Sequence, residues 1–240
     1  MTETTDRDNQ YASDAELVRD ATAFMTEYMA EHDPSHNPAH VHRVVALAYQ
    51  ILEAENALES SSPHPKYDKT VVTLAALLHD VEDRKYLKTD TTTATGNIVC
   101  DFLISKGANP AIAQRVQMIA SNVSYSTEIK DPGRIQKLLE QDAYRELAIV
   151  QDADRLDALG AVGIGRCFTF LGAQGQKHVP PGRTWDLDLA MNHFADKLLR
   201  LEGMIKTRAG REMARVRTNR LLKFRSWWEE EVGAGREAHS

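Results

Sequence analysis

The stretch VVTLAALLHD, residues 71–80, decides the fold of this 240-residue chain more than any other. It holds eight residues without a charge and then the adjacent polar pair His79 and Asp80. The run is far too short to cross a bilayer, and we expect it to form the core of a buried helix from Tyr67 to about Glu82. Polar groups at the end of a buried helix need partners, and charged groups need them most. The pair is therefore either a helix-terminal histidine with a capping aspartate or part of a site.

The composition of the whole chain also favours helices. Hydrophobic residues make up 42% of it, which is enough for a substantial core, whereas aromatic residues make up only 7%. Strands prefer β-branched and aromatic residues, and here alanine and leucine dominate the apolar set. We predict an all-α fold with one helical-bundle domain over residues 13–233, because no internal repeat or long linker divides the chain. The ends, 1–12 and 234–240, are expected to be disordered.

Capping signals, apolar spacing, glycine and proline predict the other helix boundaries. Ser13 to Glu16 match a capping box that opens a helix ending near residue 32, and Pro38 opens a second helix that runs to about Ala57. The other expected helices cover residues 91–106, 110–124, 144–160, 186–207 and 211–231. Residues 125–142 are expected to be mostly loop with some helix, and five glycines are expected to break up the segment 160–182.

The charge balance limits the kinds of partner. The formal net charge is -6, with 35 acidic and 29 basic residues. Such a chain has no general attraction to nucleic acid or anionic membranes, so neither is expected as a partner. A phosphorylated substrate would have to meet local positive charge, such as a metal ion. The polar, acidic N-terminus resembles neither a secretory signal nor a transit peptide, and two cysteines imply no disulfide framework, so a cytoplasmic location is expected.

Histidines are concentrated in one short region. Four of the nine fall between residues 32 and 42. His40 lies one turn before Val44 on the apolar stripe of the second helix, so it faces inward. His36 would share that face only if the helix began earlier, and Pro38 argues against this. A single inward histidine is often a satisfied core residue, which is the alternative to a ligand.

Three carboxylates interrupt a later apolar helix. Asp152, Asp154 and Asp157 lie within six residues. Aspartate is a poor helix former in the interior, and its burial has a cost that a metal, or Arg155 and Arg166, would offset. A surface stripe with local salt bridges is the alternative for Asp152 or Asp157 taken singly.

An inward histidine, the His-Asp pair and one of these carboxylates would together form a metal site. Two imidazoles and two carboxylates suit Mn, Fe, Ni, Co or Zn better than Mg. Four protein ligands leave open positions on a six-coordinate ion, where a water has a lowered pKa. We therefore predict one divalent metal ion that activates water and screens an anionic substrate.

These motifs resemble the HD-domain metal-dependent phosphohydrolases over most of the chain. The resemblance lies in His40-Val41-His42-Arg43-Val44, Leu77-Leu78-His79-Asp80 and Asp152-Ala153-Asp154-Arg155-Leu156-Asp157, and a small single-domain subgroup also shares the later element His193-Phe194-x-x-Lys197-Leu198-Leu199. It implies an all-α fold with His40, His79, Asp80 and Asp154 as the metal ligands. The additional histidines of the two-metal branch are not evident, so one ion is expected unless His36 is recruited.

The same resemblance implies hydrolysis of phosphoester or phosphoanhydride bonds, often in nucleotides. Some relatives of the subgroup are reported as pyrophosphohydrolases of deoxynucleoside triphosphates, so a nucleoside triphosphate pyrophosphohydrolase is favoured. A nucleoside 5'-monophosphatase is the first alternative, because it differs only in which phosphate lies at the ion. A non-catalytic metal or nucleotide sensor is the second.

Residues around the four ligands are candidates for catalysis and substrate binding. Asp83 lies at i+4 from His79, where it could orient the attacking water or protonate the leaving group. Glu82 is the weaker candidate, and a solvated helix end is the alternative for both. The expected substrate contacts are Arg43, His36, Lys85, Asp157, Arg155, His193 and Lys197. Arginine and lysine suit phosphoryl oxygens, although structural salt bridges would also explain the charged residues.

The C-terminal region is rich in basic and aromatic residues. Eight basic residues between 206 and 225 do not share one helical face and are followed by three glutamates. A solvated helix surface is therefore favoured over a nucleic-acid groove. Trp227 and Trp228 are expected to pack on the core or at a contact between two copies, which leaves a homodimer open.

Overall fold

The computed structural model of the chain describes residues 11–58, 67–81, 97–179 and 181–237. These residues form helices and no strands, which confirms the all-α prediction. The α-helices are α1 (Asp14–Tyr28), α2 (Pro38–Leu58), α3 (Lys69–Leu78), α4 (Ile98–Ser105), α5 (Pro110–Ala120), α6 (Tyr125–Lys130), α7 (Pro132–Leu139), α8 (Glu146–Asp157), α9 (Gly160–Gln174), α10 (Asp188–Asp196) and α11 (Arg208–Glu237). The short 3-10 helices are η1 (Asp142–Tyr144), η2 (Gly175–His178) and η3 (Leu198–Met204).

Helix α3 is the centre of the bundle. Asp68 caps its N-terminus by accepting a hydrogen bond from the backbone N–H of Val71, and every residue from Val71 to Leu78 is buried. The helix contacts α1, α2, α5 and α8. Each fully buried valine or leucine contributes about 1.5–3 kcal/mol relative to an exposed one, so this apolar run is a major source of stability. The predicted buried helix is confirmed, although it ends before His79.

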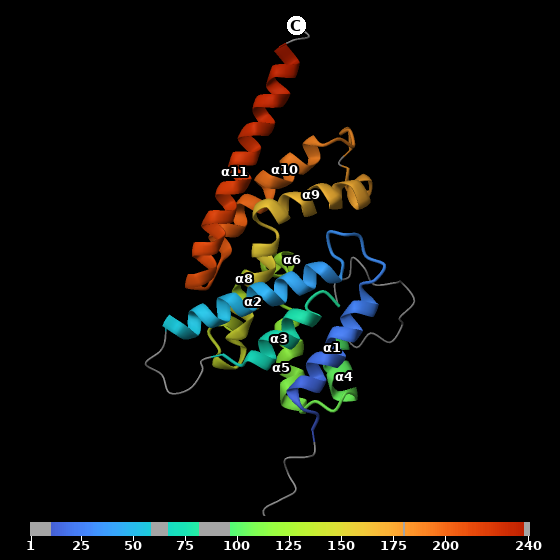
Figure 1. Cartoon of the computed structure of the whole chain (residues 1–240), viewed down its shortest axis with the longest axis vertical. Helices are drawn as coiled ribbons and strands as arrows, with labels where there is room; N and C mark the ends of the chain where they lie inside the picture. The colour runs from blue at the N-terminus through green and yellow to red at the C-terminus, as the bar shows by residue number, and fades with distance from the viewer. Residues whose placement is uncertain (1–10, 59–66, 82–96, 180, 238–240) are drawn as a thin grey trace, which may run out of the picture.

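Helices α2 and α8 lie against each other and form the middle layer (Figure 1). In Figure 1, α1, α3, α4 and α5 lie on one side of this layer, and α9, α10 and α11 lie on the other. The predicted capping box at the start of α1 is present, with Ser13 and Glu16 bonded reciprocally. These contacts bring the end of α3, the start of α2 and the end of α8 together.

The expectation that glycines break up residues 160–182 is wrong for the first half of that segment, where α9 is continuous. Gly160 has a φ of 73°, which allows the sharp turn between α8 and α9. A Cβ at Gly163 would lie 2.1 Å from the carbonyl oxygen of Ala158, so this glycine allows close packing at the same corner. Gly165 and Gly172 meet nothing within 4 Å, and a helix tolerates such exposed glycines at a cost of about 1 kcal/mol each.

The predicted helix 186–207 is also wrong, because the chain divides there into α10 and η3. Lys197 leaves the helical region, with φ -132° and ψ -60°. Ile205 is extended, and the buried carboxylate of Asp152 then accepts hydrogen bonds from the backbone N–H groups of Lys206 and Thr207. A tertiary contact from α8 therefore fixes the point at which α11 begins.

Other boundaries differ less from the predictions. Residues 125–142 contain more helix than expected, because Ser124 and Asp131 cap the short helices α6 and α7. Helix α11 continues to Glu237, so residues 234–237, which were predicted to be disordered, are helical. Trp228 packs near Phe168 and Phe224, with ring centroids 5.6 Å and 6.2 Å away, whereas Trp227 is 59% exposed. The predicted N-terminal lead, 1–10, lies outside the described residues.

Within the described parts of the chain, no single helix is both long and apolar enough to cross a membrane. One pair of segments, Asp142–Asp157 and Gly160–Lys177, reaches that length and hydropathy only when taken together, and it is bent by 71°.

Candidate metal centre and adjoining pocket

Three helices bring the four predicted metal ligands together. His40 lies in the first turn of α2, His79 and Asp80 follow the end of α3, and Asp154 lies in the last turn of α8. The Nε2 atom of His40 is 3.3 Å from Asp80 Oδ2 and 3.6 Å from Asp154 Oδ1. The Nε2 atom of His79 is 3.4 Å from Asp80 Oδ1 and 3.8 Å from Asp154 Oδ1. Potential ligand atoms from four side chains thus surround one small space.

The hydrogen bonds of the two imidazoles turn their free lone pairs toward this space. The carbonyl oxygen of Ala76 can only accept, so His79 donates from Nδ1 at 2.9 Å. His40 similarly donates from Nδ1 to the Asp157 carboxylate at 2.7 Å. The Nε2 atoms of both histidines and Oδ2 of Asp80 are buried and have no hydrogen-bond partner among the described residues.

Buried polar atoms without partners are costly, and a cation would satisfy all three of these. The candidate ligand atoms of His40, His79 and Asp80 all lie within 4.8 Å of one another. Imidazole nitrogen and carboxylate oxygen are the donors that borderline divalent metals prefer. The residues therefore fit a divalent metal ion.

The charges of the cluster are strongly interdependent. Burial raises the pKa of Asp80, but the nearby His79 and His40 lower that pKa more, so it lies well below its usual value. Burial and the nearby cation of Arg166 lower the pKa of His40. The hydrogen bond to Asp157 and the negative charge of Asp80 outweigh them, so the pKa of His40 lies above its usual value. In the metal-free protein, the carboxylates therefore favour a positive charge at the place where a metal would supply one.

Asp157 supports the cluster through its hydrogen bond to His40. Its Oδ2 accepts from Nδ1 of His40 and from Nη2 of Arg43 at 3.0 Å, and it lies 3.2 Å from Nη1 of Arg166. Its Oδ1 accepts from Nε of Arg43 at 2.7 Å. Burial alone would raise the pKa of Asp157, but these donors lower that pKa by more, so it lies well below its usual value and the carboxylate is ionised at neutral pH. Asp157 and Arg43, both predicted as substrate contacts, are thus bonded to each other and support His40.

A cavity of about 690 Å³ adjoins the cluster. It lies between α9, α10 and the residues before α2, and His36 joins it to the cluster because its ring centroid is 5.8 Å from that of His40. His193 and Lys197, two further predicted contacts, also line it. The other lining residues include cations and apolar side chains: Arg166, Arg183, Cys167, Phe170, Leu171, Leu189 and Leu198.

His36 is held in one orientation. Its Nδ1 is 2.7 Å from the hydroxyl of the buried Ser35, and that hydroxyl also bonds the carboxylate of Asp33. Burial lowers the pKa of His36 to about 4, although Asp80 and Asp154 raise it in part. His36 is therefore neutral near pH 7 and lies at the junction of the cluster and the cavity.

Arg155 is a correction to the predicted substrate contacts. Its side chain is only 1% exposed, and it donates to Glu128 at 2.5 Å and to the carbonyl oxygen of Met204 at 3.1 Å. Lys206 bonds the same Glu128 at 2.8 Å. Arg155 therefore ties α8 to α6 and to the residues before α11, instead of facing a substrate.

Sequence reasoning missed Arg166 as a site residue and treated it only as a charge that could offset buried aspartates. Its position one turn after Gly163 in α9 carries no local signal, because the contacts of Arg166 with Ser35 and Asp157 join distant parts of the chain. The predicted catalytic residues Asp83 and Glu82, and the predicted contact Lys85, lie outside the described residues and stay predictions.

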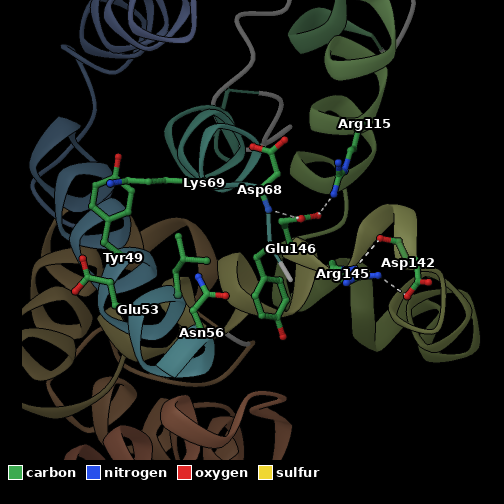
Figure 2. A pocket seen from close by; sticks show the side chains of 11 residues that line it. Tyr49, Glu53, Asn56, Asp68, Lys69, Arg115, Asp142, Arg145 and Glu146 are labelled. Atoms are coloured by element: carbon green, nitrogen blue, oxygen red, sulfur yellow. Dashed lines mark hydrogen bonds and ion pairs between the residues drawn. The ribbon is translucent and has the colours of Figure 1, made fainter. Parts of the chain in front are cut away.

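A second cavity of about 700 Å³ lies at the opposite ends of α2, α3 and α8 (Figure 2). At its centre is Glu146, which is fully buried and accepts from the backbone N–H of Asp68 at 2.9 Å and from Arg115 at 2.6 Å. Figure 2 also shows Arg145 paired with Asp142 at the edge. The bonds of Glu146 join the starts of α3 and α8 to α5, and none of the candidate metal ligands lines this cavity.

Comparison with known proteins places the chain in a family. The model of the HD domain matches residues 39–159, which contain all four candidate metal ligands. The uncharacterized protein YpgQ of Bacillus subtilis is 38% identical over 192 residues, covering 80% of this chain and 82% of YpgQ. The crystal structure of YpgQ in complex with ADP superposes with a TM-score of 0.66 and 31% identity, over 91% of this chain and 96% of that one. An HD-superfamily hydrolase from Bacillus thuringiensis gives a TM-score of 0.65 at 28% identity, over 92% and 100% of the two chains.

The chain belongs to the HD domain family, which confirms the resemblance seen in the sequence. It is accordingly a metal-dependent phosphohydrolase, whose His-Asp cluster fits a metal site.

Proposed function

We propose that this phosphohydrolase cleaves the bond between the α- and β-phosphates of a nucleoside triphosphate, with a deoxynucleotide or ribonucleotide as substrate. Water would add to the α-phosphorus, and the bond from that phosphorus to the bridging oxygen would break. The products would be a nucleoside monophosphate and pyrophosphate. The proposal depends on one observation above all: the buried, unpartnered atoms of His40, His79 and Asp80 lie beside a cavity lined by cations.

The cavity supports an anionic substrate. Arg166, Arg183 and Lys197 line it, against one carboxylate, Asp196, although the whole chain has a net charge of -6. Local positive charge concentrates anions in a cleft. A phosphate chain is therefore a better match to this lining than a neutral or cationic ligand.

The apolar part of the cavity supports a nucleotide rather than inorganic phosphate alone. Phe170, Leu171 and Leu189 offer surface to a base, and about 690 Å³ lies in the range typical of small-molecule sites. The ADP complex of YpgQ shows that a related protein binds a nucleotide. Both facts favour a base-bearing substrate.

We propose that His40, His79, Asp80 and Asp154 hold one divalent ion, with Mn, Ni, Co, Fe or Zn favoured over Mg for this donor set. When bound, the ion would lower the pKa of a coordinated water and offset charge on the phosphate. The protein residues supply the arrangement: Asp157 orients His40 through Nδ1, and the carbonyl oxygen of Ala76 orients His79.

The proposal is tested by assaying purified protein with Mn, Co, Ni or Mg against nucleoside mono- and triphosphates. Pyrophosphate release from triphosphates is the expected result. Phosphate release from monophosphates would instead indicate a 5'-monophosphatase, and bound metal without turnover would indicate a sensor. Asp80→Ala and Asp154→Ala should each abolish metal retention and activity. Asp142→Ala is the matched control, because Asp142 lies at the edge of the other cavity and its side chain is 95% exposed. This variant should change neither metal retention nor activity.

A further inference from the structure

Arg166 connects the candidate metal centre to the cavity. From α9, its Nε donates to the carbonyl oxygen of Ser35 at 2.7 Å, and its Nη1 lies 3.2 Å from Oδ2 of Asp157. The side chain is 12% exposed and lines the cavity beside His36. Arg166 is thus fixed on two sides, by the residues before α2 and by the carboxylate that supports His40.

The donors of Arg166 are only partly used. A guanidinium group has five N–H bonds in a planar fork. Ser35 takes the Nε–H and Asp157 attracts one Nη1–H, and the described residues provide no other hydrogen-bond or ion-pair partner for Arg166. Three N–H bonds therefore remain for a ligand in the cavity that the side chain lines.

Arg43 provides a direct contrast on the same carboxylate. It donates to Asp157 from both Nε and Nη2, so its fork is directed at that residue. Arg43 lines neither cavity. Two arginines thus share Asp157, but only Arg166 also faces the cavity.

We propose that Arg166 binds the phosphoryl oxygens of a polyphosphate substrate and sets them in register with the metal centre. This inference rests on the proposed phosphohydrolysis of a nucleoside triphosphate and names the residue that recognises its phosphate chain. The planar fork matches two phosphoryl oxygens, and the shared Asp157 holds that fork beside His40. The hydrogen bond from Nε of Arg166 to the carbonyl oxygen of Ser35 restrains the guanidinium from rotating away.

The test compares Arg166→Gln with Arg43→Gln, since each removes one cation from Asp157. Calorimetry would measure binding of inorganic tripolyphosphate to the protein with Mn²⁺ in excess over both, and a separate titration would measure Mn²⁺ affinity. We expect Arg166→Gln to weaken tripolyphosphate binding about 10- to 100-fold, the loss typical of a charge-assisted contact, with a matching rise in KM for triphosphates. Arg43→Gln should leave tripolyphosphate binding at saturating Mn²⁺ nearly unchanged. Its Mn²⁺ affinity should fall at least as far as that of Arg166→Gln, because Arg43 donates two hydrogen bonds to Asp157 and Arg166 forms one ion pair with it.

A second variant protects the test against misfolding. Arg166→Lys keeps the charge but not the fork, so it should recover only part of the tripolyphosphate affinity. Equal losses in Arg166→Gln and Arg43→Gln, or no loss in either, would overturn the inference. So would full recovery of both affinity and KM in Arg166→Lys, because a point charge would then suffice.

The two proposals fail in different ways. If the wild type releases pyrophosphate from triphosphates but Arg166→Gln does so with unchanged KM, only the role of Arg166 is overturned. If the wild type hydrolyses no nucleotide but binds tripolyphosphate through Arg166, the proposed reaction is overturned and the phosphate contact stands. A wild type that binds no tripolyphosphate overturns the phosphate contact itself.

Discussion

Replacing Asp157 by asparagine would remove the carboxylate that supports the candidate metal centre while preserving its size. Asp157 has one side chain for four donors, which come from His40, Arg43 and Arg166. The asparagine amide has one acceptor oxygen, and its NH₂ group would face N–H donors. An amide oxygen in the place of Oδ2 would lose the bond from Nε of Arg43, and one in the place of Oδ1 would lose the other three contacts. In either case the Nδ1 proton of His40 would lose its charged partner.

Asp157→Asn should therefore lower both the stability of the protein and its affinity for metal. Breaking a buried charged pair by removing one partner costs about 3–5 kcal/mol. The side chain of Arg43 is 36% exposed, so water replaces part of the loss, and a fall of roughly 2–4 kcal/mol in the free energy of unfolding is expected. Removing the partner that orients a metal ligand typically weakens metal affinity about 10- to 100-fold.

Asp152→Asn is the matched control for this experiment. Asp152 lies on the same helix and is equally buried, but it accepts from the backbone of Lys206 and Thr207 and from the Thr207 hydroxyl at 2.8 Å. It should lose stability without losing metal affinity. Urea unfolding of metal-free protein would measure the first quantity, and Mn²⁺ titration the second. Wild-type Mn²⁺ affinity in Asp157→Asn, or an equal loss in Asp152→Asn, would refute the reasoning.

Three further predictions concern groups near and far from the cluster. Burial raises the pKa of the Cys167 thiol to about 11 from 9.0, so at pH 8 its thiolate is about 100-fold scarcer than that of an ordinary cysteine. Alkylation by iodoacetamide, followed by mass spectrometry, should be correspondingly slow. Labelling at the rate of a free cysteine would contradict the buried position of the thiol. Glu146→Gln should lower the free energy of unfolding, measured in urea, by roughly 2–3 kcal/mol, because Arg115 loses its buried partner. It should leave Mn²⁺ affinity unchanged. A loss of Mn²⁺ affinity would show that the two ends of the bundle are coupled. Burial lowers the pKa of His36 to about 4 from 6.5, so between these two pH values the unfolded chain binds a proton that the folded protein does not. The free energy of unfolding of the metal-free protein should therefore fall by roughly 3 kcal/mol as the pH drops from 6.5 to 4. His36→Asn should flatten this dependence, and parallel pH profiles for the two proteins would count against the neutral, buried imidazole.

Several features of the fold could be predicted because their signals are local. The capping box at Ser13 and Glu16 depends on neighbouring residues alone, and it is present in α1. The inward position of His40 follows from its spacing to Val44 on one helical face, and the side chain is indeed buried. The buried helix before His79 could be predicted from the length and composition of its apolar run alone.

Other features depend on contacts between distant residues, so the sequence did not reveal them. The glycines of α9 favour a broken segment by propensity, but Gly160 supplies a positive φ at the turn, Gly163 packs closely on Ala158, and the others face open space. Arg155 and Arg166 look equivalent as cations near the aspartates. Their roles separate only because Glu128 and Met204 enclose the first, whereas the second lies against Ser35 and Asp157.

The most direct test of the central claim is an anomalous-scattering map from crystals of the protein grown with Mn²⁺. We expect one strong peak within roughly 2.0–2.3 Å of Nε2 of His40 and His79 and of the carboxylates of Asp80 and Asp154. A protein that binds Mn²⁺ elsewhere, or whose four side chains close on one another without an ion at saturating Mn²⁺, would contradict the proposed metal centre.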